Sequence, residues 1–422
     1  MKRLLNRNTI QFLIFAFCIS LTTSLKAQEE FVEEDPDAEV DINNASYTLG
    51  NGLNFSFNKG DYQFGLTGFI QPGYFRESIN GLEDVNQFSS KRTFLQFDGK
   101  ALKEKVSFFV QLDFSLSEPL LDAWIGYHPT EHVSVYFGQK QNFVNNREMT
   151  YREDRLQFTD RSFLSRSFSR TGREFGVFVT SKFGNKFGIA PMFSITSGDG
   201  RNSFGTDSRD TDLGGLKIGG RLDLYPLGFF KEGNDVTNID LGREEKPKFV
   251  VGVAASRNNG VSNNVGEGHG NFILYDANGT GNYPDYTQLY ADFLLKYQGF
   301  SLLAEYANAT ASGIDLTYTD ANATQVLAPT QISEYLVLGD SFNVQLGYIT
   351  KNGFSFDARY EVANQEFTSN TNSLLQDANS YTFGLSKYFI GNNLKVQTSY
   401  TQFNPNIGNK LNQFELLFQI AF

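Results

Sequence analysis

Cysteine is almost absent from this chain of 422 residues, because Cys18 is the only one. Histidine (3) and proline (10) are also scarce. So few cysteines exclude a disulfide-rich scaffold. No apolar run reaches the roughly 18 residues that a membrane-spanning helix needs, which excludes a polytopic helical membrane protein. The formal net charge of −11 disfavours binding to nucleic acid, because an acidic chain repels phosphates.

Aromatic residues and glycine are abundant. The chain has 42 Phe, 20 Tyr and 39 Gly but a single Trp. Phe and Tyr favour strands, and glycine favours tight turns. This composition therefore indicates many short strands joined by turns.

The N-terminus has the pattern of a secretory signal peptide. Lys2, Arg3 and Arg7 precede a short apolar run at 10–21, and Ala27 offers a small residue for cleavage. We predict a signal peptide at 1–27, with an amphipathic membrane anchor as the alternative. Cys18 does not indicate a lipoprotein, since it follows a bulky Phe and lies inside the apolar run.

Residues 28–46 form an acidic segment. Its acids lie at Glu29, Glu30, Glu33, Glu34, Asp35, Asp37, Glu39 and Asp41. Low apolar content predicts disorder here, with a contact to a cation or a partner as the alternative. Residues 47–422 then form one further domain, because no linker divides them.

Hydrophobic alternation with a period of two runs through residues 47–422. In the last segment, Phe414, Leu416, Phe418, Ile420 and Phe422 share one face, while Gln413, Glu415 and Gln419 share the other. About 16 such segments recur, near 61–77, 88–99, 104–115, 120–128, 132–139, 173–182, 185–197, 214–225, 247–257, 286–297, 300–309, 339–350, 353–363, 377–390, 393–403 and 411–422.

These segments predict an all-β transmembrane antiparallel barrel of about 16 strands. Lipid leaves backbone N–H and C=O groups unsatisfied, so a membrane sheet must close on itself, with an apolar outer and a polar inner face. Short turns alternate with long loops near 140–172, 198–213, 258–285 and 310–338. The turn at 226–246 is longer than this rule predicts. A soluble β-sandwich or β-helix is the alternative.

Phe422 ends the apolar face of the last segment. This arrangement resembles the terminal signal of outer-membrane barrels, which the barrel-assembly machinery reads. We therefore predict insertion into the lipid of a bacterial outer membrane.

Signals for an enzyme or a metal site are weak. His128 and His132 flank a Pro-Thr-Glu stretch, but the spacing differs from the H-E-x-x-H of a zinc helix and falls in an expected turn. The sequence has no P-loop, G-x-S-x-G elbow or dinucleotide fingerprint. We predict no catalytic residues, no metal and no cofactor.

The segment 141–173 concentrates arginine. It holds seven Arg and no Lys: Arg147, Arg152, Arg155, Arg161, Arg166, Arg170 and Arg173. Guanidinium groups stay charged and bind oxyanions bidentately. A loop of this kind folded into the lumen would form an anion-selecting constriction. Pairing of these arginines with local acids, or with surface polyanions outside the pore, is the alternative.

Alternation also assigns charged residues to the lumen wall. The basic members are Arg92, Lys217, Arg221, Arg359 and Lys395. They are accompanied by inward acids such as Asp113, Asp122 and Glu361, so the interior is expected to be wet and nearly balanced in charge.

Four stretches resemble the phosphate-selective porin O and P family of outer-membrane proteins. They are 121–127 (LDAWIGY), 137–140 (FGQK), 158–162 (FTDRS) and 172–177 (GREFGV). The resemblance implies a trimeric pore with the third long loop folded into the lumen. It places an anion site at Arg161, with Lys140 as the basic residue before the loop.

The sequence therefore predicts an outer-membrane porin for passive diffusion of small anions, phosphate included. Alternatives are a general diffusion porin, a non-conducting structural barrel and an outer-membrane enzyme.

Overall fold

The computed structural model describes residues 42–202, 215–268 and 270–422. The predicted signal peptide and residues 28–41 of the acidic segment lie outside the described residues, as does most of the loop expected at 198–213. No helix in the described ranges is long and apolar enough to cross a membrane.

Antiparallel strands make up most of the described chain. They are β1 (Ile42–Thr48), β2 (Gly52–Phe57), β3 (Tyr62–Ile79), β4 (Val85–Ala101), β5 (Val106–Asp113), β6 (Leu120–Thr130), β7 (Val133–Gln141), β8 (Arg173–Ser181), β9 (Gly188–Thr196), β10 (Lys217–Tyr225), β11 (Lys248–Asn258), β12 (Asp285–Tyr297), β13 (Phe300–Ser312), β14 (Gly339–Ile349), β15 (Phe354–Gln365), β16 (Ala378–Ile390), β17 (Leu394–Pro405) and β18 (Leu411–Ala421).

Helical segments are short and lie in the connections. They are η1 (Asn58–Gly60), α2 (Arg147–Thr150), η2 (Glu153–Arg155), α3 (Phe163–Phe168) and η4 (Gln331–Glu334). Three of them, α2, η2 and α3, belong to the connection between β7 and β8.

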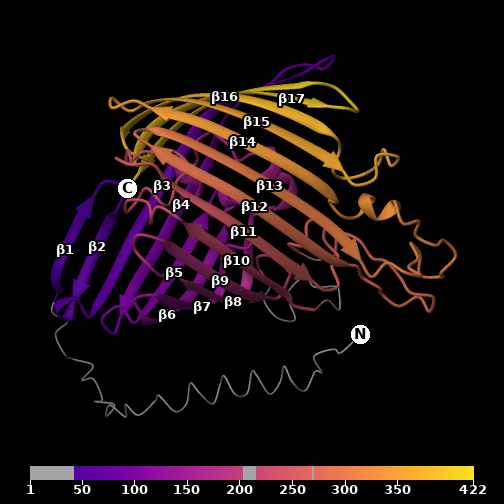
Figure 1. The fold of residues 1–422 in the computed structure, drawn as a ribbon, viewed down its shortest axis with the longest axis horizontal. Helices are drawn as coiled ribbons and strands as arrows, with labels where there is room; N and C mark the ends of the chain where they lie inside the picture. Colours follow the sequence, from indigo (N-terminus) through magenta and orange to yellow (C-terminus); the bar gives the residue numbers. More distant parts are fainter. Residues whose placement is uncertain (1–41, 203–214, 269) are drawn as a thin grey trace, which may run out of the picture. The chain divides into compact units, whose positions relative to one another are not determined.

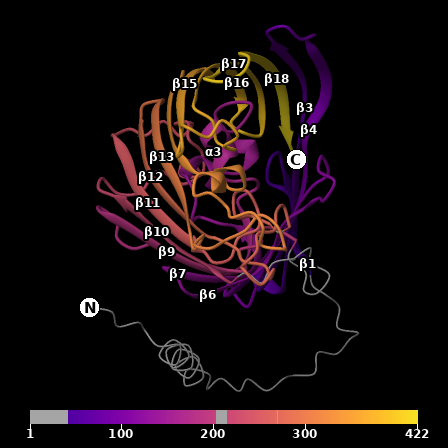
Figure 2. The same ribbon diagram turned by 90° about the vertical axis from the view of Figure 1, so that its right-hand side faces the viewer.

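Strands β3 to β18 close into a barrel. Each pairs with its neighbours along the chain, and β18 pairs with β3 from Leu411–Ile79 to Ala421–Phe69. Gly68 and Phe422 extend this seam by exchanging two backbone hydrogen bonds of 2.9 Å. Within the described residues the barrel has sixteen strands, and Figure 2 shows them surrounding α3. The predicted fold class is confirmed, and each of the sixteen predicted segments corresponds to a strand.

The hairpin of β1 and β2 is a feature that the sequence analysis missed. β2 pairs with the first residues of β3, from Leu53–Leu66 to Phe57–Tyr62, beyond the point where β18 ends. β1 pairs with the other edge of β2. Residues 42–46 of the acidic segment therefore belong to the sheet. Figure 1 shows this hairpin in indigo beside the start of β3.

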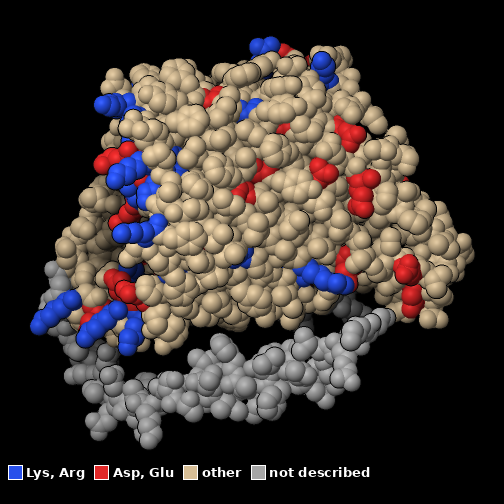
Figure 3. Space-filling model, viewed as in Figure 1, with Lys and Arg blue, Asp and Glu red and all other residues tan. Residues whose placement is uncertain are grey.

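The two faces of the barrel differ as alternation predicts. Phe356 and Phe383 are exposed on the outer face, whereas Gln345, Glu361 and Ser380 are buried on the inner face. Figure 3 shows an outer surface with few charged residues over its middle. Apolar groups therefore face outward and polar groups inward, the reverse of a soluble core.

The seam generates the first prediction. A Cβ at Gly68 would lie 2.5 Å from the Phe94 carbonyl oxygen and 2.9 Å from the Phe422 ring. We expect Gly68→Ala to destabilise the closed barrel by about 1–3 kcal/mol through overpacking. Less protein should keep the fast-migrating form on unboiled gels.

The control is Gly220→Ala, at an outward position of β10 where the nearest atom to a Cβ is the Met192 carbonyl oxygen at 3.4 Å. Equal amounts of closed barrel in the two variants would contradict this role of the seam.

Candidate functional site

The connection 142–172, which we call the inner loop, folds into the barrel lumen. Its base is closed by a hydrogen bond of 2.7 Å from the Asn142 N–H to the Gly172 carbonyl oxygen. Gly172 has a φ of 66°, and a Cβ there would lie 2.6 Å from Gln141 Nε2, so only glycine fits without strain. The sequence analysis predicted that the arginine-rich loop near 140–172, the third loop of the resemblance, folds into the lumen. The structure confirms this prediction.

The first turn of the inner loop is held by ion pairs and hydrogen bonds to the far wall. Arg147 donates from Nε to Asp292 Oδ1 on β12 (2.6 Å) and from Nη2 to Asp223 Oδ1 on β10 (2.9 Å). The Glu148 N–H donates to Glu305 Oε1 on β13 at 2.8 Å. These groups are buried, so each charge needs the partner that the structure provides.

Inward-facing glycines make room for the loop on this wall. A Cβ at Gly252 would lie 2.6 Å from Arg147 Nη2. Similarly, a Cβ at Gly347 would lie 2.3 Å from Gln157 Nε2. The wall is therefore hollowed where the loop packs closest.

The tip of the inner loop reaches both sides of the β18–β3 seam. Thr159 donates from Oγ1 to Glu415 Oε2 on β18 at 2.5 Å. Asp160 pairs with Lys91 on β4 at 3.1 Å and with Arg92 at 3.3 Å. Lys91 also pairs with Glu415 at 2.6 Å. The tip thereby joins strands on either side of the seam.

The predicted anion residue Arg161 is buried within the inner loop. Its Nη1 donates to the Glu148 carbonyl oxygen (2.6 Å), and its Nη2 donates to the Tyr151 carbonyl oxygen (2.8 Å) and to Glu153 Oε1 (2.9 Å). Arg173 donates to the same carboxylate oxygen at 3.0 Å. The guanidinium of Arg161 thus points into the loop, where it organises the backbone.

Glu153 is the acid on which these two arginines converge. Burial by itself raises the pKa of the Glu153 carboxyl, but the Arg173 and Arg161 guanidiniums hold that pKa well below its usual range. The carboxylate therefore stays charged and joins the inner loop to Arg173, the first residue of β8.

The remaining predicted arginines of the loop differ in exposure. Arg166 is exposed, with Nη1 3.9 Å from Asp160, and Arg170 is exposed near the end of the loop. Arg152 and Arg155 are partly exposed, with side chains 31% and 30% accessible. Pairing with a local acid, part of the alternative for the arginine cluster, describes Arg161 and Arg173 through Glu153, whereas Arg147 pairs with Asp223 and Asp292 of the wall.

The predicted cations of the wall do face inward, but their side chains are buried and not exposed to water in an open lumen. Lys217 donates to Glu174 Oε1 at 3.0 Å, and Arg221 donates to Asp292 Oδ2 at 2.5 Å. Lys395 donates to the Leu156 carbonyl oxygen of the loop at 3.4 Å. Arg92 and Arg359 likewise contact the loop at Asp160, through its side chain and its carbonyl oxygen respectively. The expectation of a wet interior is wrong for this part of the wall, because the inner loop covers it.

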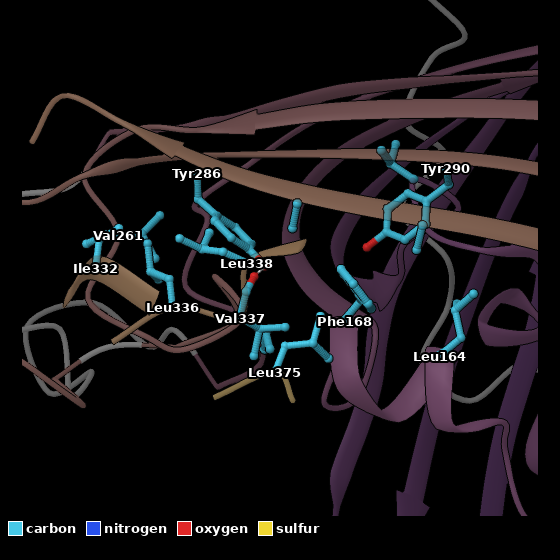
Figure 4. Close-up of a cluster of buried hydrophobic side chains, with 14 of the residues drawn as sticks. Leu164, Phe168, Val261, Tyr286, Tyr290, Ile332, Leu336, Val337, Leu338 and Leu375 are labelled. Carbon is cyan, nitrogen blue, oxygen red and sulfur yellow. Dashed lines mark hydrogen bonds between the residues drawn. The ribbon is translucent and has the colours of Figure 1, made fainter. Parts of the chain in front are cut away.

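The end of the inner loop packs into an apolar cluster. Leu164 and Phe168 of α3 are fully buried there. Figure 4 shows them near Tyr290 of β12, with Leu338 and Leu375 from the long connections close by. Glu267, from the connection 259–284, accepts hydrogen bonds from the backbone N–H groups of residues 170–172. The connections at the long-loop end of the barrel thus contact the inner loop and hold it in the lumen.

The turn 226–246 also folds inward, from the short-turn end. Lys296 on β12 donates from Nζ to the carbonyl oxygens of Thr237 (2.6 Å) and Ile239 (3.0 Å). Asn238 donates to Gln345 Oε1 on β14 at 3.1 Å. This insertion accounts for the unusual length of the turn, to which the sequence alone assigned no role.

Open space remains beside β5 to β10. A cavity of about 560 Å³ is lined by Arg152 and Arg155 of the inner loop, by Ser134 of β7 and by Asp235 of the inserted turn. A second cavity, of about 160 Å³, is lined by Lys140 and again by Arg152. Arg152 therefore borders both cavities.

Where the inner loop borders the larger cavity, two arginines share one acid. Asp154 is buried and is the shared partner of two guanidiniums, at 2.5 Å from Arg152 Nε and 3.7 Å from Arg155 Nε. One carboxylate thus faces two partly exposed cations. Lys140 lies nearby, over the rings of Trp124 and Tyr136.

The described residues contain no group of three or more His, Cys, Asp or Glu side chains placed to hold a metal ion. His128 lies on β6, hydrogen-bonded to the hydroxyls of Ser107 (2.7 Å) and Ser134 (2.8 Å). His132 lies in the turn that follows β6.

Comparisons with solved structures support the fold. The outer membrane channel DcaP of Acinetobacter baumannii is 12% identical over 86% of this chain and 99% of its own, with a TM-score of 0.54. OmpT of Vibrio cholerae lacking loop L8 is 12% identical over 86% of this chain and 100% of its own, with a TM-score of 0.51.

No family sequence model matches the chain, and no curated protein matches it. The resemblance to the phosphate-selective porin O and P family is therefore not confirmed at the level of the family. The comparisons show the architecture of an outer-membrane channel barrel, and that architecture is the one this chain adopts.

The second prediction tests the role of Arg161. Arg161→Ala removes the donor of the Tyr151 carbonyl oxygen and one of the two guanidiniums at Glu153 Oε1, where Arg173 remains. We expect a cost of about 1–3 kcal/mol to the loop, because a buried acceptor loses its hydrogen bond. We expect trypsin to cut the folded barrel within 147–173, as mapped by mass spectrometry, while the barrel itself survives.

Arg166→Ala is the control, because its exposed pair is worth at most about 1 kcal/mol. An inner loop that resists trypsin equally in both variants would show that Arg161 does not hold it.

The third prediction concerns pH. Because the folded pKa of Glu153 lies below the unfolded one, its stabilisation is complete above about pH 4.5 and declines as pH falls. We expect the current through single barrels to become noisier as pH falls from about 4.5 to about 3, because the loop then loosens. Glu153→Gln should be noisy at neutral pH already. Current that is equally quiet in Glu153→Gln and in the unmodified protein at pH 7 would contradict this assignment.

Proposed function

We propose that this protein is an outer-membrane porin that lets small anions, phosphate among them, diffuse passively. The closed sheet, its apolar outer face and its likeness to outer-membrane channel barrels support a membrane pore. The short turns then face the periplasm and the long loops face outward. Concentration gradients drive transport, so the proposal needs neither a catalytic group nor a cofactor.

The observation that carries the anion preference is the shared carboxylate at Asp154. Arg152 and Arg155 both pair with this one buried acid, and their own side chains are partly exposed to the larger cavity. Arg152 donates to Asp154 from both Nε and Nη2, while Arg155 lies 3.7 Å from the same acid. These three groups together carry one net positive charge at the open part of the lumen, where Asp235 also lines the cavity. Confined space with little water strengthens such a charge relative to an open surface.

The roles of the predicted site residues follow from this geometry. Anions would meet Arg152, Arg155 and Lys140 in the lumen, and Arg166 and Arg170 nearer the long-loop entrance. Arg147, Arg161 and Arg173 would hold the inner loop in place. The anion role that the family resemblance implies for Arg161 thus passes to its neighbours in the loop.

Assembly completes the proposal. One solved structure of Vibrio cholerae OmpT is a trimer form, 11% identical with a TM-score of 0.50, and we propose a homotrimer here too. We also propose export through the signal peptide at 1–27 and reading of Phe422 by the barrel-assembly machinery. The backbone of Phe422 already pairs with Gly68 at the seam.

The fourth prediction uses reversal potentials in asymmetric KCl. The unmodified channel should favour chloride over potassium. The double variant Arg152→Ala and Arg155→Ala leaves Asp154 unpaired in the lumen, so the chloride-to-potassium permeability ratio should fall about three- to tenfold, on the scale of one charge-assisted contact.

Arg76→Ala is the control, because Arg76 also pairs with one acid, Asp84 at 2.6 Å, but lies near the tip of the β3–β4 hairpin. Equal permeability of the two ions in the unmodified channel would point to a general diffusion porin. Absence of any current would point to a non-conducting barrel.

A further inference from the structure

Three aromatic residues form a continuous strip on the inner face of β5, β6 and β7. Phe109 and Trp124 are directly opposite each other in the sheet, with ring centroids 5.6 Å apart. Trp124 meets Tyr136 edge to face at 4.9 Å. All three side chains are partly exposed. We call Phe109, Trp124 and Tyr136 the aromatic strip.

The aromatic strip differs from other inward aromatic residues of this barrel because its rings are partly exposed, whereas Phe69, Tyr286 and Tyr290 are fully buried. Inward residues on the other strands are mostly polar, for example Gln96, Ser194, Gln288, Asn343, Ser380 and Gln397. The outer residues next to the strip, Phe108 and Ile125, are apolar as lipid contact requires. A partly exposed apolar surface inside an aqueous lumen has no such cause, so it indicates contact with a solute.

Two cations stand beside the strip. Lys140 Nζ lies 5.1 Å from the ring centroid of Trp124 and 4.9 Å from that of Tyr136. Arg152 reaches the same cavity of about 160 Å³ from the inner loop, and Phe109 and Trp124 line it from the wall. Apolar ring faces and positive charges therefore meet in one small space.

Most polar groups of this cavity already have protein partners. Arg152 donates to Asp154 from Nε and Nη2 and to Gln96 Oε1 from Nη1, so within the described residues Lys140 is the cation of this cavity whose side chain makes no hydrogen bond. Gln111 Oε1 accepts from Arg173 at 3.1 Å, and Gln141 Nε2 donates to the Met149 carbonyl oxygen at 2.6 Å. Asp122 accepts from the Gln141 N–H at 2.7 Å and from Arg173 at 3.3 Å. A polyhydroxylated solute such as a sugar would leave hydroxyls unpaired here, which costs free energy.

We propose that the aromatic strip, with Lys140 and Arg152, is a binding subsite for organic anions that have a flat apolar body, such as aromatic carboxylates. This inference rests on the proposed anion porin and names the class of anion that it favours. The carboxylate faces the two cations while the ring lies against Phe109 and Trp124. Offset and edge-to-face ring contacts are the geometry that such a strip offers.

Trp124 makes the test direct, because it is the only tryptophan in the chain. Purified barrel in detergent is titrated with benzoate, acetate or glucuronate while tryptophan fluorescence is followed. Benzoate should saturate the signal at a concentration several-fold lower than acetate or glucuronate. Equal concentrations for benzoate and acetate would overturn the proposal, and stronger binding of glucuronate would replace it with a sugar-acid site.

Two variants on one strand separate the strip from general effects. Phe109→Leu removes an inward ring but keeps an apolar side chain, and should raise the half-saturating benzoate concentration about two- to tenfold. Phe108→Leu makes the same change on the adjacent lipid-facing residue and should leave benzoate binding unchanged. Lys140→Met should weaken benzoate and acetate together. Benzoate binding that is insensitive to both Phe109→Leu and Lys140→Met would overturn the subsite.

Failure of the subsite and failure of the proposed function give different results. Reversal potentials in KCl measure whether the pore prefers anions, whereas the ratio of benzoate to acetate measures whether the strip adds affinity for a ring. An anion-selective pore with equal affinity for benzoate and acetate rejects the subsite alone. A pore without anion preference rejects the proposed function, whatever the ratio.

Discussion

Closure of the sheet is the constraint on which the rest of the structure depends. Backbone N–H and C=O groups find no partners in lipid, so the sixteen strands must pair around a full circle and end where they began, at β18 and β3. The circle fixes which residues face outward and which face a shared interior. It also brings strands from opposite ends of the sequence within reach of one loop.

The interior that results is crowded with charge rather than filled with water on every side. The inner loop contributes arginines and acids, and the wall contributes acids, arginines and lysines, so that each buried charge in these clusters has a partner. Arg147 between Asp223 and Asp292 is the clearest case. A removed partner therefore destabilises the loop more than an exposed pair would. Among the described residues, open space lies beside β5 to β10, and there Arg152 and Arg155 share one carboxylate, Asp154.

Alternation made the fold predictable, because a period of two sustained over about ten residues is typical of a strand with one apolar face, and sixteen such strands suit a closed sheet. The sequence also located the arginine-rich loop, since its composition differs sharply from the rest of the chain. Roles within that loop were not predictable in the same way. The sequence does not distinguish Arg161 from Arg152. The structure shows that Arg161 contacts Glu153 and two carbonyl groups, whereas Arg152 borders two cavities.

Two other features escaped prediction for different physical reasons. The hairpin of β1 and β2 is short: β1 is mostly polar, and β2 alternates only over Leu53, Phe55 and Phe57, well below the length of about ten residues of the predicted segments. The inserted turn 226–246 depends on contacts from Lys296, more than 50 positions away along the chain. Excess length was the available hint to the inserted turn. Inward glycines such as Gly252 and Gly347 mark instead where the wall makes room for the inner loop.

The contacts of the loop tip bear on the order in which the molecule assembles. Thr159 and Asp160 belong to the middle of the chain, yet they bind Glu415 near its end and Lys91 near its beginning. If the first and last strands joined before the loop had entered, Lys91 and Glu415 would pair with each other, but Asp160 would have to leave water and find them through a closed ring. We therefore expect the inner loop to enter the lumen before β18 pairs with β3. Side chains at the tip of the loop would then guide the pairing of these two strands from inside the barrel.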